Sequence, residues 1–241
     1  MLKPVRYPSG INNARLFSST SIGAVRQNHP LYNLPVPDRA RLFQDFDDFK
    51  RYAAADWTVT AVGASTAALL AGNGGFLRLL TGAINGNSEN IQDAIASSAF
   101  VSGNQFWFSA RITPQLAVAP EYYFGLMNGG ATAPSAATDG VYFHSSAASA
   151  NVDLVLSKAS VVTTIAAIAT LADATASIWS FYHDGASTLY YYKDNILLGS
   201  TTALTNLPVV SLAQQFYTAN GAAATNTLDI DYYLLAAEIA R

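Results

Sequence analysis

Cysteine is absent from the 241 residues of this sequence, which excludes disulfides, thiolate metal sites and cysteine nucleophiles. Charged residues are scarce as well, at 12% of the chain against roughly 25% in typical soluble domains. A surface with few charges costs little free energy to desolvate, whereas a free monomer usually keeps more charge for solubility. The composition therefore favours a protein that is packed against other subunits.

The motifs that mark common enzymes are also missing. The sequence has no G-x-S-x-G nucleophile elbow, no phosphate-binding P-loop and no G-x-G-x-x-G segment after a predicted strand. His29, His144 and His183 lie far apart, without the short spacing of a metal site. The three glutamates do not form the E-x-D-x-x-E pattern that aims two carboxylates at a sugar in laminarinase-like glycosidases. We expect no enzyme activity, no catalytic residue, no cofactor and no bound metal.

Long apolar runs are absent too. No uninterrupted apolar stretch reaches the length of a membrane-spanning helix, and residues 1–8 lack the apolar core of a secretory signal. We therefore expect a protein without a membrane partner, made in a cytoplasm and kept there until it is assembled.

What the sequence does contain is a distinct N-terminal segment. Residues 1–40 hold five of the nine prolines, which disfavour helix interiors and central strands. Residues 1–44 carry six basic residues and one acidic residue, whereas the remainder of the chain is acidic. Six scattered basic residues do not form a concentrated nucleic-acid-binding patch. We predict an extended arm over 1–40 that docks on a neighbour, with an unstructured terminus as the alternative, followed by one domain over 41–241.

From residue 41 onward, short segments rich in β-branched and aromatic residues alternate with turn signals. Asn73-Gly74 and Asp184-Gly185 are typical hairpin dipeptides. Within 227–234, the alternation predicts that Leu228, Ile230, Tyr232 and Leu234 share one face. At least eight strands with few helices indicate an antiparallel sandwich or barrel. The predicted strands span 75–81, 106–112, 122–127, 141–144, 152–157, 177–183, 188–193, 196–199 and 227–234.

Three segments fit this pattern less well. Aromatic residues at 43, 46 and 49 have the spacing of a helix. Residues 88–97 are compatible with a short helix capped by Ser88. The alanine-rich residues 161–176 are ambiguous, because their β-branched start favours a strand and their alanines favour a helix.

Carboxylates and aromatic residues leave two further functional interpretations open. Asp229 and Asp231 share a strand face, as do Asp45 and Asp47 if residues 43–49 form a strand. Such pairs are typical of a solvated strand face, with calcium binding or acid chemistry as the alternative. Three tryptophans and thirteen tyrosines are expected to fill the core and subunit contacts, although exposed rings could also stack on sugars.

Several short motifs occur in a defined order along nearly the whole chain. The motifs are Leu34-Pro35-Val36-Pro37-Asp38, Phe46-Asp47-Asp48-Phe49, Asp56-Trp57-Thr58-Val59-Thr60, the segments 74–81, 107–111, 139–143 and 181–185, Leu207-Pro208, and 228–232. In their order and spacing these motifs resemble tailed-bacteriophage capsid decoration (cement) proteins with a concanavalin A-like jelly-roll fold.

The resemblance implies a non-enzymatic virion protein on the capsid exterior, with the major capsid protein as partner and a homotrimer as the assembly. It also implies that residues 46–49 form a strand near the last strand of the chain. We adopt this expectation in place of the helix that the spacing of the aromatic residues suggests. The fold expected is an antiparallel jelly-roll sandwich with an extended N-terminal arm. A carbohydrate-binding or host-adhesion module is the alternative, since a shared fold does not fix function. The arm residues expected to grip a neighbour are Arg6, Tyr7, Arg15, Phe17, Arg26 and Tyr32.

Overall fold

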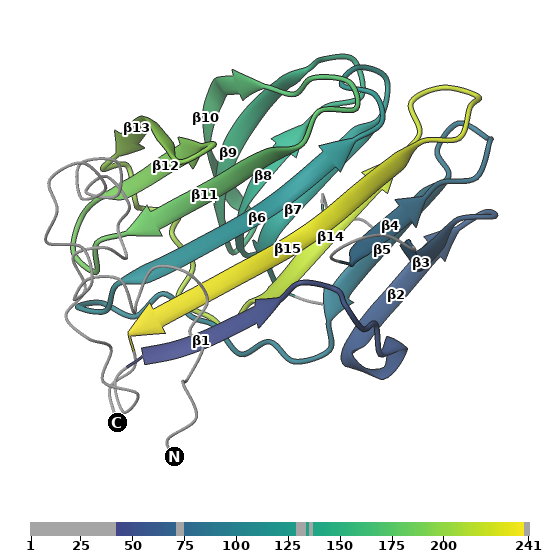
Figure 1. Cartoon of the computed structure of the whole chain (residues 1–241). Coiled ribbons are helices and arrows are strands. Elements are labelled where there is room, and N and C mark those ends of the chain that lie inside the picture. The colour runs from purple at the N-terminus through teal and green to yellow at the C-terminus, as the bar shows by residue number, and fades with distance from the viewer. Residues whose placement is uncertain (1–41, 71–74, 129–133, 135–136, 239–241) are drawn as a thin grey trace, which may run out of the picture.

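A computed structural model describes residues 42–70, 75–128, 134 and 137–238 of the chain. These residues form β-strands, connecting loops and one short 3-10 helix, η2 (Ala54–Asp56). The strands build two antiparallel sheets that pack face to face (Figure 1), so the predicted all-β sandwich is confirmed. Within the described residues, no helix has the length and apolar character needed to cross a bilayer.

One sheet has eight strands, and β15 is the longest of them. The first half of β15 pairs with β4, and its second half pairs with β1 (Leu42–Asp47), which lies off the main strand path. The main path runs through β13 (Ile196–Thr201), β12 (Leu189–Lys193), β11 (Ser177–His183), β6 (Phe106–Pro114), β15 (Thr227–Glu238), β4 (Phe76–Leu80) and β3 (Thr66–Leu70).

The other sheet has seven strands. Neighbours in it are often far apart in the sequence, as in the pairing of β14 with β5 and β7. Both sheets therefore combine hairpins with long crossovers. The order is β10 (Val161–Thr170), β9 (Asn151–Lys158), β8 (Gly140–Ser145), β7 (Glu121–Met127), β14 (Ala213–Ala219), β5 (Ser88–Asp93) and β2 (Trp57–Val62).

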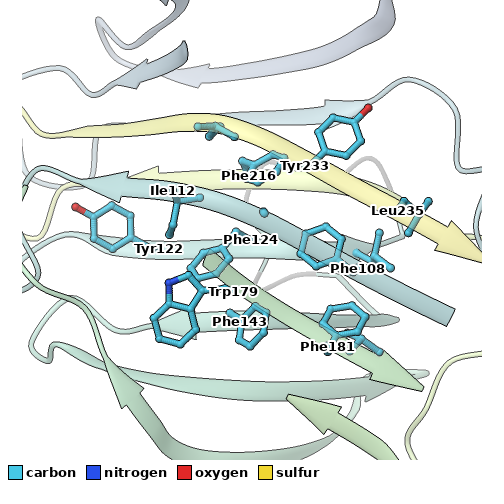
Figure 2. Packing of buried hydrophobic residues seen from close by; sticks show 14 of the residues in the cluster. Phe108, Ile112, Tyr122, Phe124, Phe143, Trp179, Phe181, Phe216, Tyr233 and Leu235 are labelled. Carbon is cyan, nitrogen blue, oxygen red and sulfur yellow. The ribbon is translucent and has the colours of Figure 1, made fainter. Parts of the chain in front are cut away.

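The hydrophobic core fills the space between the two sheets, as Figure 2 shows. The Trp179 ring packs 5.5 Å from Phe143 and 5.9 Å from Phe124, so residues of the two sheets meet directly. Phe181 lies 5.1 Å from Phe108 in the same cluster. Alternate residues of each strand point inward and bury aromatic rings, which is the period-two pattern that the sequence shows.

All three segments that fitted the pattern less well contain strands, so the helix predicted for 88–97 is wrong. Residues 88–93 are strand β5, with Ile91 in the core and hydrogen-bonded neighbours on both sides. Pairing of β5 with β14 and with β2 therefore outweighs the local helix signal of a single serine cap. Residues 42–47 form strand β1, which pairs with β15, so the strand that the resemblance implied for 46–49 includes Phe46 and Asp47 but not Asp48 and Phe49. Residues 161–170 form β10, which contains a bulge between Ile165 and Ala169.

A bulge also corrects the predicted alternation of the last strand. The register of β15 against β6 shifts between Ile230 and Tyr232. Leu228 and Ile230 are fully buried in the core, but beyond the shift the core positions are Tyr233 and Leu235. The prediction that Tyr232 and Leu234 share a face with Leu228 and Ile230 is therefore wrong, because one extra residue reverses the faces of a strand.

Candidate interaction surface

The four strands that end the two sheets contain no charged residue. They are β13 and β3 in one sheet and β10 and β2 in the other. Strands next to them do carry charges, for example Lys193 on β12, Arg78 on β4 and Asp153 on β9. This distribution reverses the usual one, because natural edge strands commonly use lysine or other charges to block pairing with another chain.

Strands β10 and β13 lie on the same side of the sandwich, and together they form what we call the β10–β13 edge. The Lys193 ammonium joins the two sheets here by donating to the Thr170 carbonyl at 2.8 Å. The Asn206 amide donates to Thr163 Oγ1 at 2.9 Å and holds the loop after β13 against β10. Apolar side chains on this edge are exposed, including Ile196 at 68% and Val161 at 60%.

Strands β2 and β3 form the opposite side, the β2–β3 edge (Figure 1). A tight turn joins them, in which the Ser65 hydroxyl donates to the Val62 carbonyl and accepts from the Gly82 N–H. Val59, Val62 and Leu69 are each exposed by 40% or more. Both sides of the sandwich therefore present neutral, partly apolar strands.

Bulges limit, but do not abolish, pairing at the β10–β13 edge. In β10, Ala167 takes a left-handed conformation with φ 50°, and its N–H donates to the Asp153 carboxylate at 2.7 Å. This irregularity leaves Val161–Ile165 as the regular part of the strand. The β2–β3 edge has no register shift against its neighbours within the described residues. Regular, neutral edges are open to further strand contacts.

The arm residues predicted from the sequence are Arg6, Tyr7, Arg15, Phe17, Arg26 and Tyr32, and all of them lie outside the described residues. The two uncharged edges were not predicted as sites. A sequence signal existed for them, because no charged residue occurs between Trp57 and Leu77 or between Asn195 and Leu228. Only the strand order shows that parts of these neutral stretches end the sheets.

An acidic pocket of about 640 Å³ opens beside β1, at the margin of the sandwich. Asp45 faces inward from β1, and its carboxylate accepts hydrogen bonds from Tyr233 at 3.1 Å and from Gln214 at 3.0 Å. Burial raises the pKa of Asp45, and nearby Asp93 and Asp47 raise it further. The expected solvation of Asp45 and Asp47 is thus incomplete, but in the described part of the chain no group of acidic or histidine side chains could hold a metal.

Asp229 and Asp231 are engaged by arginines on the outer face of the eight-stranded sheet. Arg78 makes two hydrogen bonds of 2.7 Å to the Asp229 carboxylate, and Arg111 pairs with Asp231. These partly exposed ion pairs replace the freely solvated carboxylates that the sequence suggested. Each carboxylate already has a cationic partner, which leaves no open pair for acid chemistry.

A cluster of aromatic rings covers the outer face of the seven-stranded sheet. Tyr123 stacks on His144 at 4.3 Å and lies 5.6 Å from both Tyr142 and Tyr217. The Glu121 carboxylate contacts His144 Nε2 at 3.2 Å and accepts from the Tyr123 hydroxyl at 3.1 Å. The hydrogen bond from His144 holds the pKa of Glu121 below its usual range. The three tyrosines are nevertheless no more than 6% exposed.

Two other titratable groups are buried without full hydrogen bonding. Both carboxylate oxygens of Glu89 lack a partner, and burial raises the pKa of Glu89 to about 7. Burial also lowers the pKa of His183, whose Nδ1 accepts from the Gly185 N–H at 3.2 Å. Neither group lines the acidic pocket.

Comparison with solved structures identifies the fold as a concanavalin A-like jelly roll. A protein of unknown function from Shewanella oneidensis MR-1 matches with a TM-score of 0.59 and 16% identity, covering 92% of this chain and 95% of that one. The endo-1,3-beta-glucanase from Streptomyces sioyaensis matches with a TM-score of 0.60 and 13% identity, and the match covers 85% of this chain and 99% of the glucanase. Peanut lectin matches with a TM-score of 0.53 and 9% identity, and the match covers 83% of this chain and 99% of the lectin.

No family model matches the sequence, and no curated protein matches it. Identities of 9–16% with the structures above show a shared fold and do not carry activity to this chain.

Proposed function

We propose that this chain is a non-enzymatic structural subunit that decorates the exterior of a bacteriophage capsid and reinforces contacts between major capsid proteins. The observation that carries the proposal is the pair of uncharged, partly apolar edges on the sandwich. Exposed apolar surface of this kind marks protein–protein contact, and it suits a subunit of a larger assembly. The resemblance of the sequence motifs to capsid decoration proteins suggests that this assembly is a bacteriophage capsid.

The proposed mechanism is mass action. A subunit that binds only the assembled, expanded shell stabilises that shell in proportion to its binding free energy, so many weakly bound copies suffice. The basic N-terminal residues, through Arg6, Arg15 and Arg26, are proposed to contribute to the grip on an acidic neighbour.

Purified expanded capsids that lack the decoration protein provide the test. The full-length chain should co-sediment with these capsids and raise the temperature at which they release DNA. A full-length variant with Arg6, Arg15 and Arg26 changed to serine should bind at least tenfold more weakly, whereas Lys50→Ser, an exposed change outside the arm, should bind normally. No binding of the unmodified chain to expanded capsids contradicts the proposal.

A carbohydrate-binding module is the second candidate, and the Tyr123, Tyr142 and Tyr217 cluster with Glu121 and His144 favours it. Rings beside a carboxylate and an imidazole are groups that bind sugars in proteins, and the structurally similar proteins include a glucanase and a lectin. The low exposure of the rings argues against it. A glycan array probed with the full chain tests this candidate. Reproducible glycan binding that is lost in Tyr142→Ser and kept in Ile84→Ser would support a carbohydrate-binding module, and no binding would contradict it.

A further inference from the structure

We infer that the two uncharged edges bind each other between copies of this chain, head to tail, with the β10–β13 edge of one copy against the β2–β3 edge of the next. This inference rests on the proposal that the chain is an assembly subunit, and it names the neighbour that covers these edges.

The first step is that both edges are built alike although they come from different parts of the sequence. Each edge consists of the last strand of the eight-stranded sheet and the last strand of the seven-stranded sheet. Of the residues in these four strands, Trp57 is the one that is buried, whereas β14 and β7 in the sheet interior are buried almost throughout. The described residues of the chain therefore leave both edges uncovered.

The second step concerns charge. A neutral surface gains nothing from a charged partner, because the partner's charges would lose water without finding an opposite charge. The best match for a neutral, apolar edge is another neutral edge, and each copy supplies one on each side. The exposed apolar side chains include Val162, Ile196 and Leu197 on one edge and Val59, Val62 and Leu69 on the other.

The third step is that the strand lengths match across the proposed contact. β13 has six residues, with a register shift against β12 at Leu198, and β3 has five. The regular part of β10, Val161–Ile165, likewise matches the six residues of β2. Each sheet of one copy could thus continue into the same sheet of the next. Contacts of this heterologous kind produce a ring when the rotation between copies closes and an open filament when it does not, and the proposed homotrimer corresponds to a ring of three copies.

Two full-length variants test the inference by sedimentation velocity and native mass spectrometry. Variant one carries Val162→Lys and Ile196→Lys on the β10–β13 edge, and variant two carries Val59→Lys and Leu69→Lys on the β2–β3 edge. The unmodified chain should form a defined oligomer, and each variant alone should be monomeric, with at least tenfold weaker association. Circular dichroism confirms that both variants are folded.

An equimolar mixture of the two variants gives the decisive result. Each variant keeps one intact edge, so a head-to-tail contact predicts one-to-one heterodimers and no larger species. Like-to-like contacts predict instead that one variant alone still forms dimers, and this result overturns the inference.

The matched control places lysines at exposed apolar loop positions, Ile84→Lys and Val101→Lys, and should keep the oligomer. A monomeric unmodified chain at 100 μM also overturns the inference, and does so whether or not the chain binds capsids.

Discussion

Interior and terminal strands of this sandwich differ in what they bury and in where their charges lie. Phe181 on interior strand β11 is fully buried, whereas Leu197 on terminal strand β13 is half exposed. Interior strands carry charged side chains, some of which are paired, as Arg78 is with Asp229. Terminal strands carry none. The interior strands therefore determine whether the chain folds, and the terminal strands offer surface to a neighbour.

Strand β1 sharpens this contrast, because it is a peripheral strand that does carry carboxylates. Asp45 and Asp47 lie along it, and the acidic pocket opens there. A charged strand resists pairing with another chain, since the charges would be desolvated. The neutrality of β2, β3, β10 and β13 is thus a property of particular strands, and it does not simply follow from the low charge of the whole sequence.

The largest expected effect comes from the interior. Phe181→Ala removes a fully buried ring that packs 5.1 Å from Phe108 and 6.0 Å from Phe143, which should lower the free energy of unfolding by about 3–5 kcal/mol. Urea denaturation measures the loss. Leu197→Ala on the terminal strand is the control and should cost less than about 1 kcal/mol at protein concentrations where the chain is monomeric. Equal losses in the two variants would contradict the division between interior and terminal strands.

The second effect concerns the buried carboxyl group of Glu89 on interior strand β5. Its pKa is about 7 in the folded state, above the ordinary value of 4.5, because burial disfavours the charged form. Between these values the unfolded chain loses the proton and the folded chain keeps it, so the contribution of Glu89 to stability is fully present below pH 4.5 and is lost as the pH rises toward 7. Over this pH range the free energy of unfolding loses a contribution from Glu89 on the order of 3 kcal/mol.

Glu89→Gln should remove this part of the pH dependence. Urea denaturation at intervals between pH 4.5 and 8 would show a flatter profile for the variant than for the unmodified protein. The control is Asp48→Asn, at an exposed position whose pKa the Lys50 side chain lowers, so it should leave the profile in this range unchanged. Parallel profiles for Glu89→Gln and the unmodified protein would show that Glu89 ionises normally in the fold.

A smaller effect is expected for the ion pair on the outer face of interior strands β4 and β15. Arg78 and Asp229 are joined by two hydrogen bonds but are partly exposed, so solvent screens their attraction. A double-mutant cycle with Arg78→Ala and Asp229→Ala should give a coupling of about 1 kcal/mol. A coupling indistinguishable from zero would mean that the pair does not stabilise the sheet.

The smallest effect on folding is expected at the terminal strands. Ile196→Lys changes a side chain that is 68% exposed, so the free energy of unfolding of the dilute monomer should change by no more than about 0.5 kcal/mol. Chemical denaturation at low micromolar concentration measures it, with Ile84→Lys as the exposed loop control. A loss above about 1.5 kcal/mol would place Ile196 in the core and remove β13 from the set of free edges.

Much of the fold was predictable from local sequence patterns, and the exceptions have physical reasons. The hairpin around Asp184-Gly185 joins β11 to β12 as expected, because the turn dipeptide and the flanking aromatic residues act locally. Strand β5 was mistaken for a helix, since its stability comes from β14 and β2, which are distant in the sequence. The bulge in β15 depends on its pairing with β6 and left no local signal.

The candidate surface was less predictable than the fold. Low charge in the sequence already indicated a protein in contact with neighbours, but it did not say where. The stretch from Asn195 to Leu228 is uncharged and includes both exposed Ile196 and fully buried Phe216. Composition cannot separate these two positions, because burial depends on which strand lies beside each of them.

The sequence by itself determined that this chain forms a β-sandwich, through turns at short intervals and apolar residues at alternate positions. It also determined that little charge is available for the surface. Only the tertiary structure decided which neutral strands end the sheets, because strand order arises from hydrogen bonds between residues that are far apart along the chain. The same long-range pairing decided that Glu89 is buried without a partner and that Asp229 meets Arg78.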